Sequence, residues 1–146
     1  MIAKPVCPLL RALVLVGAVL VVAFATPAYA KSRDKLLTET LRAYAATIRW
    51  GSIEQAESFV NPAWRAEHPL STLELERYKQ VRFTAYNERP AIPVSDFEVR
   101  QSVEIAVVNL HTQEMRTIID NQVWKFDKKA KAWTLHSGLP DLSRRN

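Results

Sequence analysis

Asp120 is the residue whose position in this sequence bears most directly on chemistry. It lies in a strand-like segment, residues 115–126, and strict alternation turns it to the same side as Trp124 and Phe126. An unpaired buried carboxylate is costly, and Asp and Asn are common where strands are irregular. We therefore expect a bulge at Asp120 or Asn121 that returns Asp120 to water. The alternative is a carboxylate facing an internal pocket, where it could act as an acid or base.

The other residue types with catalytic or metal-binding potential give weaker signals. His68, His111 and His136 fall in a loop, at a turn and at a strand end, without the short spacing that places two imidazoles on one metal. Cys7, the only cysteine, precedes the domain, so we expect neither thiol chemistry nor disulfides in the domain. The domain has no glycine-rich phosphate loop and no nucleophile elbow. We predict no metal and no cofactor.

The first thirty residues are typical of a secretory signal peptide. A basic start without acidic residues leads into an apolar run at 12–25, and Ala-Tyr-Ala at 28–30 is the pattern that signal peptidase cuts after. We predict cleavage after Ala30 and a periplasmic or secreted domain at 31–146. The run is short for a membrane span of roughly 20 residues, so we expect no stable membrane insertion after cleavage. The alternative is an uncleaved anchor.

The composition of residues 31–146 is that of one domain. About 116 residues can fold unaided, burying roughly two thirds of the unfolded surface. The formal charge of +5 for the whole chain includes Lys4 and Arg11, which leave with the signal peptide. The remaining basic residues are spread out, which argues against a nucleic-acid partner. We interpret the lysine cluster at 128–131 as a solvated hairpin tip, the alternative being weak attraction to anionic lipid or cell-wall polymer.

Helices are predicted in the first half of this domain. One begins at Ser32 or Asp34 and ends at Gly51, because its apolar residues form a single stripe: Leu37, Leu41, Tyr44 and Ile48. Capping boxes open two more helices, one reaching Phe59 and one reaching about Gln80. The boxes are Ser52 with Gln55 and Ser71 with Glu74. Residues 62–70 are expected to form a surface loop.

Four strands follow, at 81–86, 97–110, 115–126 and 132–136, with polar turns between them. Trp124 and Phe126 share one parity, as do Trp133 and Leu135, so these side chains can meet across a hairpin in the core. Helices followed by an antiparallel meander predict the α+β class: N-terminal helices packed on a strongly curved antiparallel sheet.

The strand at 97–110 becomes apolar on both faces near its end. Ala106, Val108 and Leu110 face away from the side that carries Ile105 and Val107. An apolar sheet face that meets water needs a cover. We predict a homodimer through this face.

The element order resembles the NTF2-like superfamily, the cone-shaped fold of ketosteroid isomerase-like and SnoaL-like proteins, which is also described as cystatin-like. The resemblance rests on the second helix ending near Phe59-Val60-Asn61-Pro62, and on the closing hairpin of Trp124-Lys125-Phe126 and Trp133-Thr134-Leu135. It covers roughly Asp34 to Pro140, and the chain also looks like the small exported, mostly uncharacterised members found in proteobacteria. It implies a pocket between helices and sheet.

The same resemblance implies what an enzyme would need. Tyr44 is at a position where the isomerases carry an oxyanion donor, and Asp120 could be the buried acid that assists it. The carboxylate base expected shortly after the second helix is missing, because residues 61–64 are Asn-Pro-Ala-Trp, with Glu67 and His68 a few residues late. Tyr44 and Asp120 are therefore weak catalytic candidates.

The function expected from these observations is a non-catalytic binding or protein-interaction module. Tyr44, Asp120 and Trp124 are its candidate ligand-binding residues, and its partner would be a small apolar ligand, a protein or a second copy. One alternative is a ketosteroid isomerase-like or dehydratase-like enzyme acting on a small apolar substrate. Another is a membrane-anchored assembly factor, which requires that the first thirty residues are retained.

Overall fold

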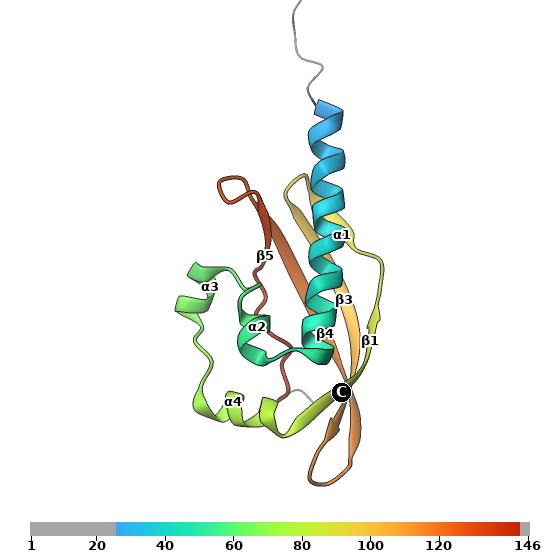
Figure 1. Ribbon diagram of the computed structural model, residues 1–146, viewed down its shortest axis with the longest axis vertical. Coiled ribbons are helices and arrows are strands. Elements are labelled where there is room, and N and C mark those ends of the chain that lie inside the picture. The colour runs from blue at the N-terminus through green and yellow to red at the C-terminus, as the bar shows by residue number, and fades with distance from the viewer. Residues whose placement is uncertain (1–25, 144–146) are drawn as a thin grey trace, which may run out of the picture.

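The computed structural model describes residues 26–143, in which helices precede a five-stranded antiparallel sheet (Figure 1). The sheet is strongly curled into a half-barrel, and the N-terminal helix packs against it. The elements are α1 (Thr26–Trp50), α2 (Ile53–Glu57), α3 (Pro62–Glu67), α4 (Thr72–Lys79), β1 (Val81–Glu88), β2 (Ile92–Ser95), β3 (Glu98–Asn109), β4 (Met115–Asp127) and β5 (Ala132–Leu135). The predicted α+β class is confirmed.

Helix α1 is longer than its capping pattern predicts. It starts at Thr26, so the expected start at Ser32 or Asp34 is wrong, and it continues through Ala30 and Lys31 without a break. Pro27 does not interrupt it, because a proline in the first helical turn removes only an amide that has no partner there. The helix ends as expected, with the Gly51 amide donating to the Thr47 carbonyl at 2.7 Å.

The predicted signal peptide falls largely outside the described residues, since the apolar run at 12–25 precedes Thr26. Between residues 26 and 143, no helix is both long enough and apolar enough to cross a bilayer.

The short helices confirm both capping boxes and add a helix. Ser52 and Ser71 each accept a bond from the backbone amide three residues on, and the side chains of Gln55 and Glu74 bond back to the cap amides. The loop expected at 62–70 instead contains α3. Asn61 caps it, because its Oδ1 accepts from the backbone amides of Ala63 and Trp64, and a proline follows at the first position.

The sheet order is β1-β3-β4-β5, with β2 also paired to β3. Strand β2 was not expected, because Pro90 and Pro93 break the pattern. It pairs with the start of β3, and β1 pairs with the remainder. Both therefore lie along the edge of β3 that faces away from β4, where a proline is tolerated.

The pairing of β3 with β4 is regular from Glu98 opposite Lys125 to Val108 opposite Met115. The bulge predicted at Asp120 or Asn121 is therefore wrong, and Asp120 points inward, only 8% exposed. Register shifts lie instead in β1, between Phe83 and Ala85, and in β2, between Pro93 and Ser95.

The core sits between α1 and the concave face of the sheet. Tyr44 and Ile48 of α1 pack with Trp124, Trp133 and other residues of the sheet in one buried cluster. The aromatic pair predicted across the last hairpin is present, with the rings of Phe126 and Trp133 at 5.4 Å. A second cluster lies around Ile105 and Ile118 and is completed by Leu142 from the C-terminal segment.

Candidate functional site

The concave face holds a group of buried polar side chains, here called the inner polar cluster: Tyr44, Tyr86, Asp120 and Gln122. Asp120, Gln122 and Trp124 occupy alternate positions of β4, so all three point toward α1. Tyr44 comes from the buried stripe of α1, and Tyr86 comes from β1. Two of these elements pack directly on one another, since α1 contacts β1.

Gln122 connects the members of this cluster. Its Nε2 donates to Asp120 Oδ2 at 2.7 Å and to the Tyr86 hydroxyl at 2.8 Å. Its Oε1 accepts from the Trp124 indole at 3.0 Å. Because Gln122 is only 1% exposed, these bonds replace the water that its amide would otherwise require.

Asp120 is a carboxyl group that titrates near neutral pH. Burial raises its pKa from 3.8 to about 6, and the hydrogen bond from Gln122 opposes that rise. The interior disfavours the charged form, and the described contacts give the carboxylate no cation to compensate.

Three tyrosines lie within the electrostatic reach of Asp120. Burial raises the pKa of Tyr44, Tyr78 and Tyr86, and the negative charge of Asp120 adds to the rise in each. These phenols therefore stay protonated at neutral pH and can only donate or accept hydrogen bonds. Tyr78 uses its hydroxyl as a donor to the Pro140 carbonyl at 2.7 Å.

The hydroxyl of Tyr44 is buried without a hydrogen-bond partner among the described residues. The ring itself is well packed, with its centroid 5.4 Å from that of Phe59 and 5.2 Å from that of Trp124. An unsatisfied buried hydroxyl costs about 1 to 3 kcal/mol. Tyr44 is therefore held here by the packing of its ring and not by a bond from its oxygen.

The three residues expected to bind a ligand, Tyr44, Asp120 and Trp124, do come together, and all three are buried. Three clefts of 680, 530 and 430 Å³ open on the described surface, and none is lined by any of the three. Tyr44 and Trp124 are each 0% exposed. Tyr78, the third tyrosine near Asp120, does lie at the surface, because it lines two of these clefts.

Glu67 and His68, the ionisable residues nearest in sequence to the expected base, lie away from Asp120. Glu67 and His68 line the 530 Å³ cleft beside α3, a cleft that Asp120 does not reach. The His68 ring stacks on Trp64 at 4.3 Å. Within residues 26–143, no three His, Cys, Asp or Glu side chains are grouped closely enough to hold a metal ion.

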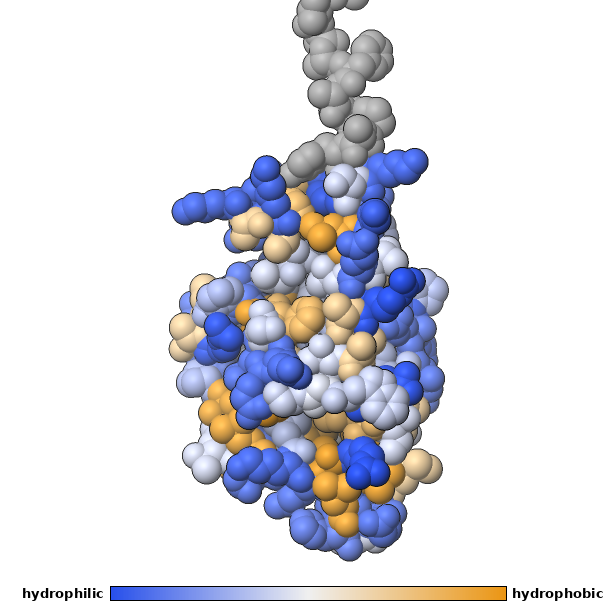
Figure 2. Space-filling model, viewed as in Figure 1, coloured by the Kyte–Doolittle hydropathy of each residue, from blue (hydrophilic) through white to orange (hydrophobic). Residues whose placement is uncertain are grey.

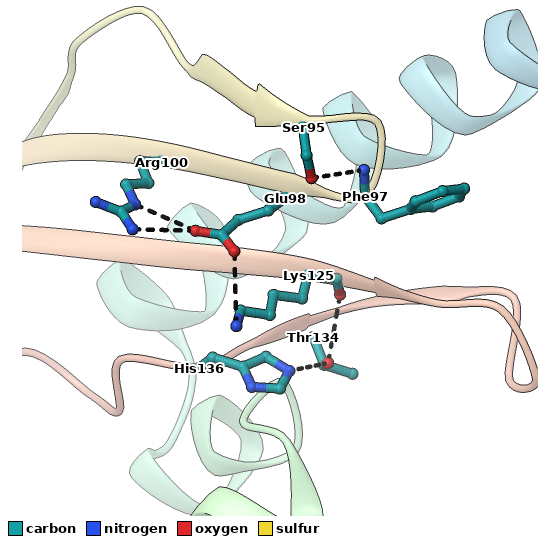
Figure 3. Close-up of polar contacts among 7 residues, drawn as sticks. All are labelled: Ser95, Phe97, Glu98, Arg100, Lys125, Thr134 and His136. Atoms are coloured by element: carbon teal, nitrogen blue, oxygen red, sulfur yellow. Dashed lines mark hydrogen bonds and ion pairs between the residues drawn. The ribbon is translucent and has the colours of Figure 1, made fainter.

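A second polar group lies on the convex face of the sheet, across β3, β4 and β5 (Figure 3). Glu98 pairs with Arg100 at 3.2 Å and with Lys125 at 3.6 Å, while His136 bonds to the Thr134 hydroxyl at 3.2 Å. A histidine that activates a hydroxyl needs a carboxylate to orient it, and the bonds of Glu98 go to the two cations instead. Exposed pairs of this kind contribute little to stability.

Sequence reasoning missed Tyr86 as a member of the inner polar cluster. Alternation with Val81 and Phe83 turns it outward, and only the register shift after Phe83 brings it to the concave face. Gln122 did carry a signal, because it shares its parity with Asp120 and Trp124.

Replacement of Asp120 by Asn should stabilise the protein at neutral pH and not at pH 4. The folded protein binds a proton more tightly at Asp120 than the unfolded chain does, so its free energy of unfolding falls as pH rises from about 4 to about 6. The difference between the two pKa values corresponds to about 3 kcal/mol. Urea denaturation at neutral pH and at pH 4 measures the free energy of unfolding. Asp96→Asn, at an exposed turn, is the control. A gain that does not depend on pH would contradict this account.

Tyr44→Phe and Tyr86→Phe should affect stability in opposite ways. Removing the unpartnered hydroxyl of Tyr44 should leave the free energy of unfolding unchanged or raise it by about 1 kcal/mol. Removing that of Tyr86 should lower it by about 1 kcal/mol, because Gln122 loses a partner. Thermal and urea unfolding of both variants provide the comparison. Equal losses would show that the Tyr44 hydroxyl is bonded.

Comparison with known proteins leaves the identity of the chain open. No family model matches it, and no curated protein matches it. What the molecule does is therefore inferred from its own residues and their contacts.

Proposed function

We propose that this chain is a periplasmic, NTF2-like domain that works as a non-catalytic binding or protein-interaction module. The supporting observation is the packed interior, because Tyr44, Trp124 and Leu135 are each 0% exposed and belong to one core cluster between α1 and the sheet. The proposal of the NTF2-like superfamily is supported by the helix lying in a curled antiparallel half-barrel. Binding then takes place on the outer surface.

The surface proposed for interaction is the convex face near the β3–β4 turn. Val108 and Met115 are directly paired there, as are Ala106 and Thr117. Met115 is 68% exposed, and Val108 lies directly opposite it on the same face. Leu110 belongs elsewhere, because it lines the 430 Å³ cleft with Ile48 and other residues at the end of α1.

This face is proposed to form a homodimer. An interface with twofold symmetry brings the same patch of two copies together. An apolar patch on regularly paired strands can pack against a second copy of itself in this way. The helices do not compete for this face, since α1 contacts β1 and β5, and its buried side chains lie on the concave side.

Native mass spectrometry of protein extracted from the periplasm of its own host tests the proposal. The expected result is a dimer of chains that begin at Lys31, with no small molecule retained in the filled interior. Met115→Glu should give a monomer, because it places two carboxylates in the interface. Leu73→Glu is the matched control, since Leu73 is 61% exposed on α4. A wild-type monomer would exclude the dimer, and a mass for the whole chain would favour the anchored assembly factor.

A second candidate function is acid–base catalysis of the ketosteroid isomerase or dehydratase type. It is favoured by the neighbourhood of Tyr44 and Asp120, since a neutral phenol and a carboxyl group near its pKa could both donate to a developing oxyanion. It would require the interior to open and a base to enter from outside the cluster.

This candidate predicts turnover of a small β,γ-unsaturated ketone by the wild-type protein. Because each group would stabilise the oxyanion, Tyr44→Phe and Asp120→Asn should lower kcat at least about tenfold, while Asp96→Asn should not. The ultraviolet absorbance of the conjugated product measures the rate. A wild-type rate equal to that of buffer alone would remove this candidate and leave the binding module.

A further inference from the structure

Basic side chains from two distant parts of the sequence gather at one end of the molecule. Helix α1 contributes Lys31, Arg33 and Lys35 at its beginning, and the turn between β4 and β5 contributes Lys128, Lys129 and Lys131. Figure 1 places the start of α1 and the tip of the β4–β5 hairpin toward the same end, and Figure 2 shows hydrophilic side chains projecting on both sides there. These six residues are here called the basic end.

Direct contacts hold the two halves of the basic end together. The Phe97 ring lies under the Arg33 guanidinium at 4.6 Å and under Lys128 Nζ at 3.9 Å. The indole of Trp133 donates to the Arg33 carbonyl at 3.2 Å. The packing of α1 on the sheet therefore fixes the hairpin tip beside the start of the helix, despite the like charges that this brings together.

The acidic residues near the basic end do not cancel its charge. The Asp127 carboxylate is turned toward the hairpin, where it accepts from the amides of Lys129 and Ala130 at 2.8 and 3.0 Å. Glu39 lies near Lys35 at 3.8 Å, a pair that is exposed and therefore weak. Asp34 and Asp96 are also acidic residues of this end, and Glu98 next to Phe97 is paired with Arg100 and Lys125, which leaves an excess of positive charge.

The segment from α2 to α4 carries the opposite bias. In the segment from α2 to α4, five glutamates face three basic residues: Glu54, Glu57, Glu67, Glu74 and Glu76 against Arg65, Arg77 and Lys79. This segment lies away from the hairpin tip (Figure 1). A molecule polarised in this way orients itself near a charged surface, with its basic end toward negative charge.

We propose that the basic end docks on a bilayer that contains anionic phospholipids. The position of the apolar run supports a bilayer as the partner, because residues 12–25 directly precede Thr26, where α1 begins, and so hold the basic end next to the membrane before cleavage after Ala30. Basic clusters next to such a run interact with anionic headgroups, each charge strengthening the attraction while salt weakens it. The β4–β5 tip comes about a hundred residues later in the chain, and the fold brings it beside the start of α1.

A dye at the hairpin tip tests this proposal on the full chain. With Cys7 replaced by Ser, an environment-sensitive dye is attached at Ala130→Cys on the tip, or at His111→Cys in the β3–β4 turn as the control. Vesicles of phosphatidylcholine, with or without phosphatidylglycerol, are then added at low and high salt. The tip dye should respond only to vesicles with phosphatidylglycerol and only at low salt, and the dye at 111 should not respond. The same measurement on the chain that begins at Lys31 should give the same result, because the apolar run is then absent and cannot bring the protein to the vesicles.

Charge variants give the matched comparison. Replacing Lys128, Lys129 and Lys131 together by Gln should weaken the response of the tip dye about tenfold or more. Replacing Arg65, Arg77 and Lys79 by Gln removes the same number of positive charges from the α3–α4 side. This variant should leave the response of the tip dye unchanged. The proposal would be overturned if the two triple variants responded equally. It would also be overturned if the tip dye responded to neutral vesicles, or to soluble polyphosphate added in place of vesicles.

Discussion

The side chain of Gln122 is the interaction on which the inside of this molecule depends. It satisfies Asp120, Tyr86 and Trp124 together, and so lets β4 carry a carboxyl group on its buried face without a break in pairing. Without that bridge, the desolvated carboxyl group would favour a bulge that turns it to water. With it, β3 and β4 stay in register over their shared length and the sheet can curl around α1 as one surface.

The space between α1 and the sheet is packed with the protein's own side chains. The aromatic side chains that could have lined a pocket pack on each other instead, as Tyr44 does with Trp124 and Phe126 does with Trp133. The concave face thus serves stability, while the buried acid and the unpartnered phenol are features that a well-packed core tolerates at a cost. Their proximity is nevertheless what gives the acid–base alternative its physical basis.

The surfaces left for partners differ in chemistry and in position. The convex face near Met115 carries apolar side chains on regularly paired strands, whereas the basic end is charged and built from a helix start and a hairpin tip. Because the β3–β4 turn and the hairpin tip lie toward opposite ends of the sheet, one surface can be covered while the other remains accessible (Figure 1). Dimerisation and membrane docking are therefore compatible in one molecule.

The sequence by itself determined the elements whose signals are local. The two-residue period of β3, the stripe of α1 and the two capping boxes each depend on neighbouring residues, and all are found in the structure. Helix α3 has a local signal too, since Asn61 and Pro62 are a cap followed by a proline, but the same residues also suit a turn.

Only the tertiary structure decided which polar groups are buried. Whether Asp120 stays inward depends on Gln122 and on Tyr86 from another strand, and Tyr86 reaches that face because β1 shifts its register after Phe83. The pairing of β2, despite Pro93, likewise depends on the free edge of β3. Alternation along one strand predicts which face each side chain is on. Whether a polar side chain can stay buried on that face depends on hydrogen-bond partners from other parts of the chain.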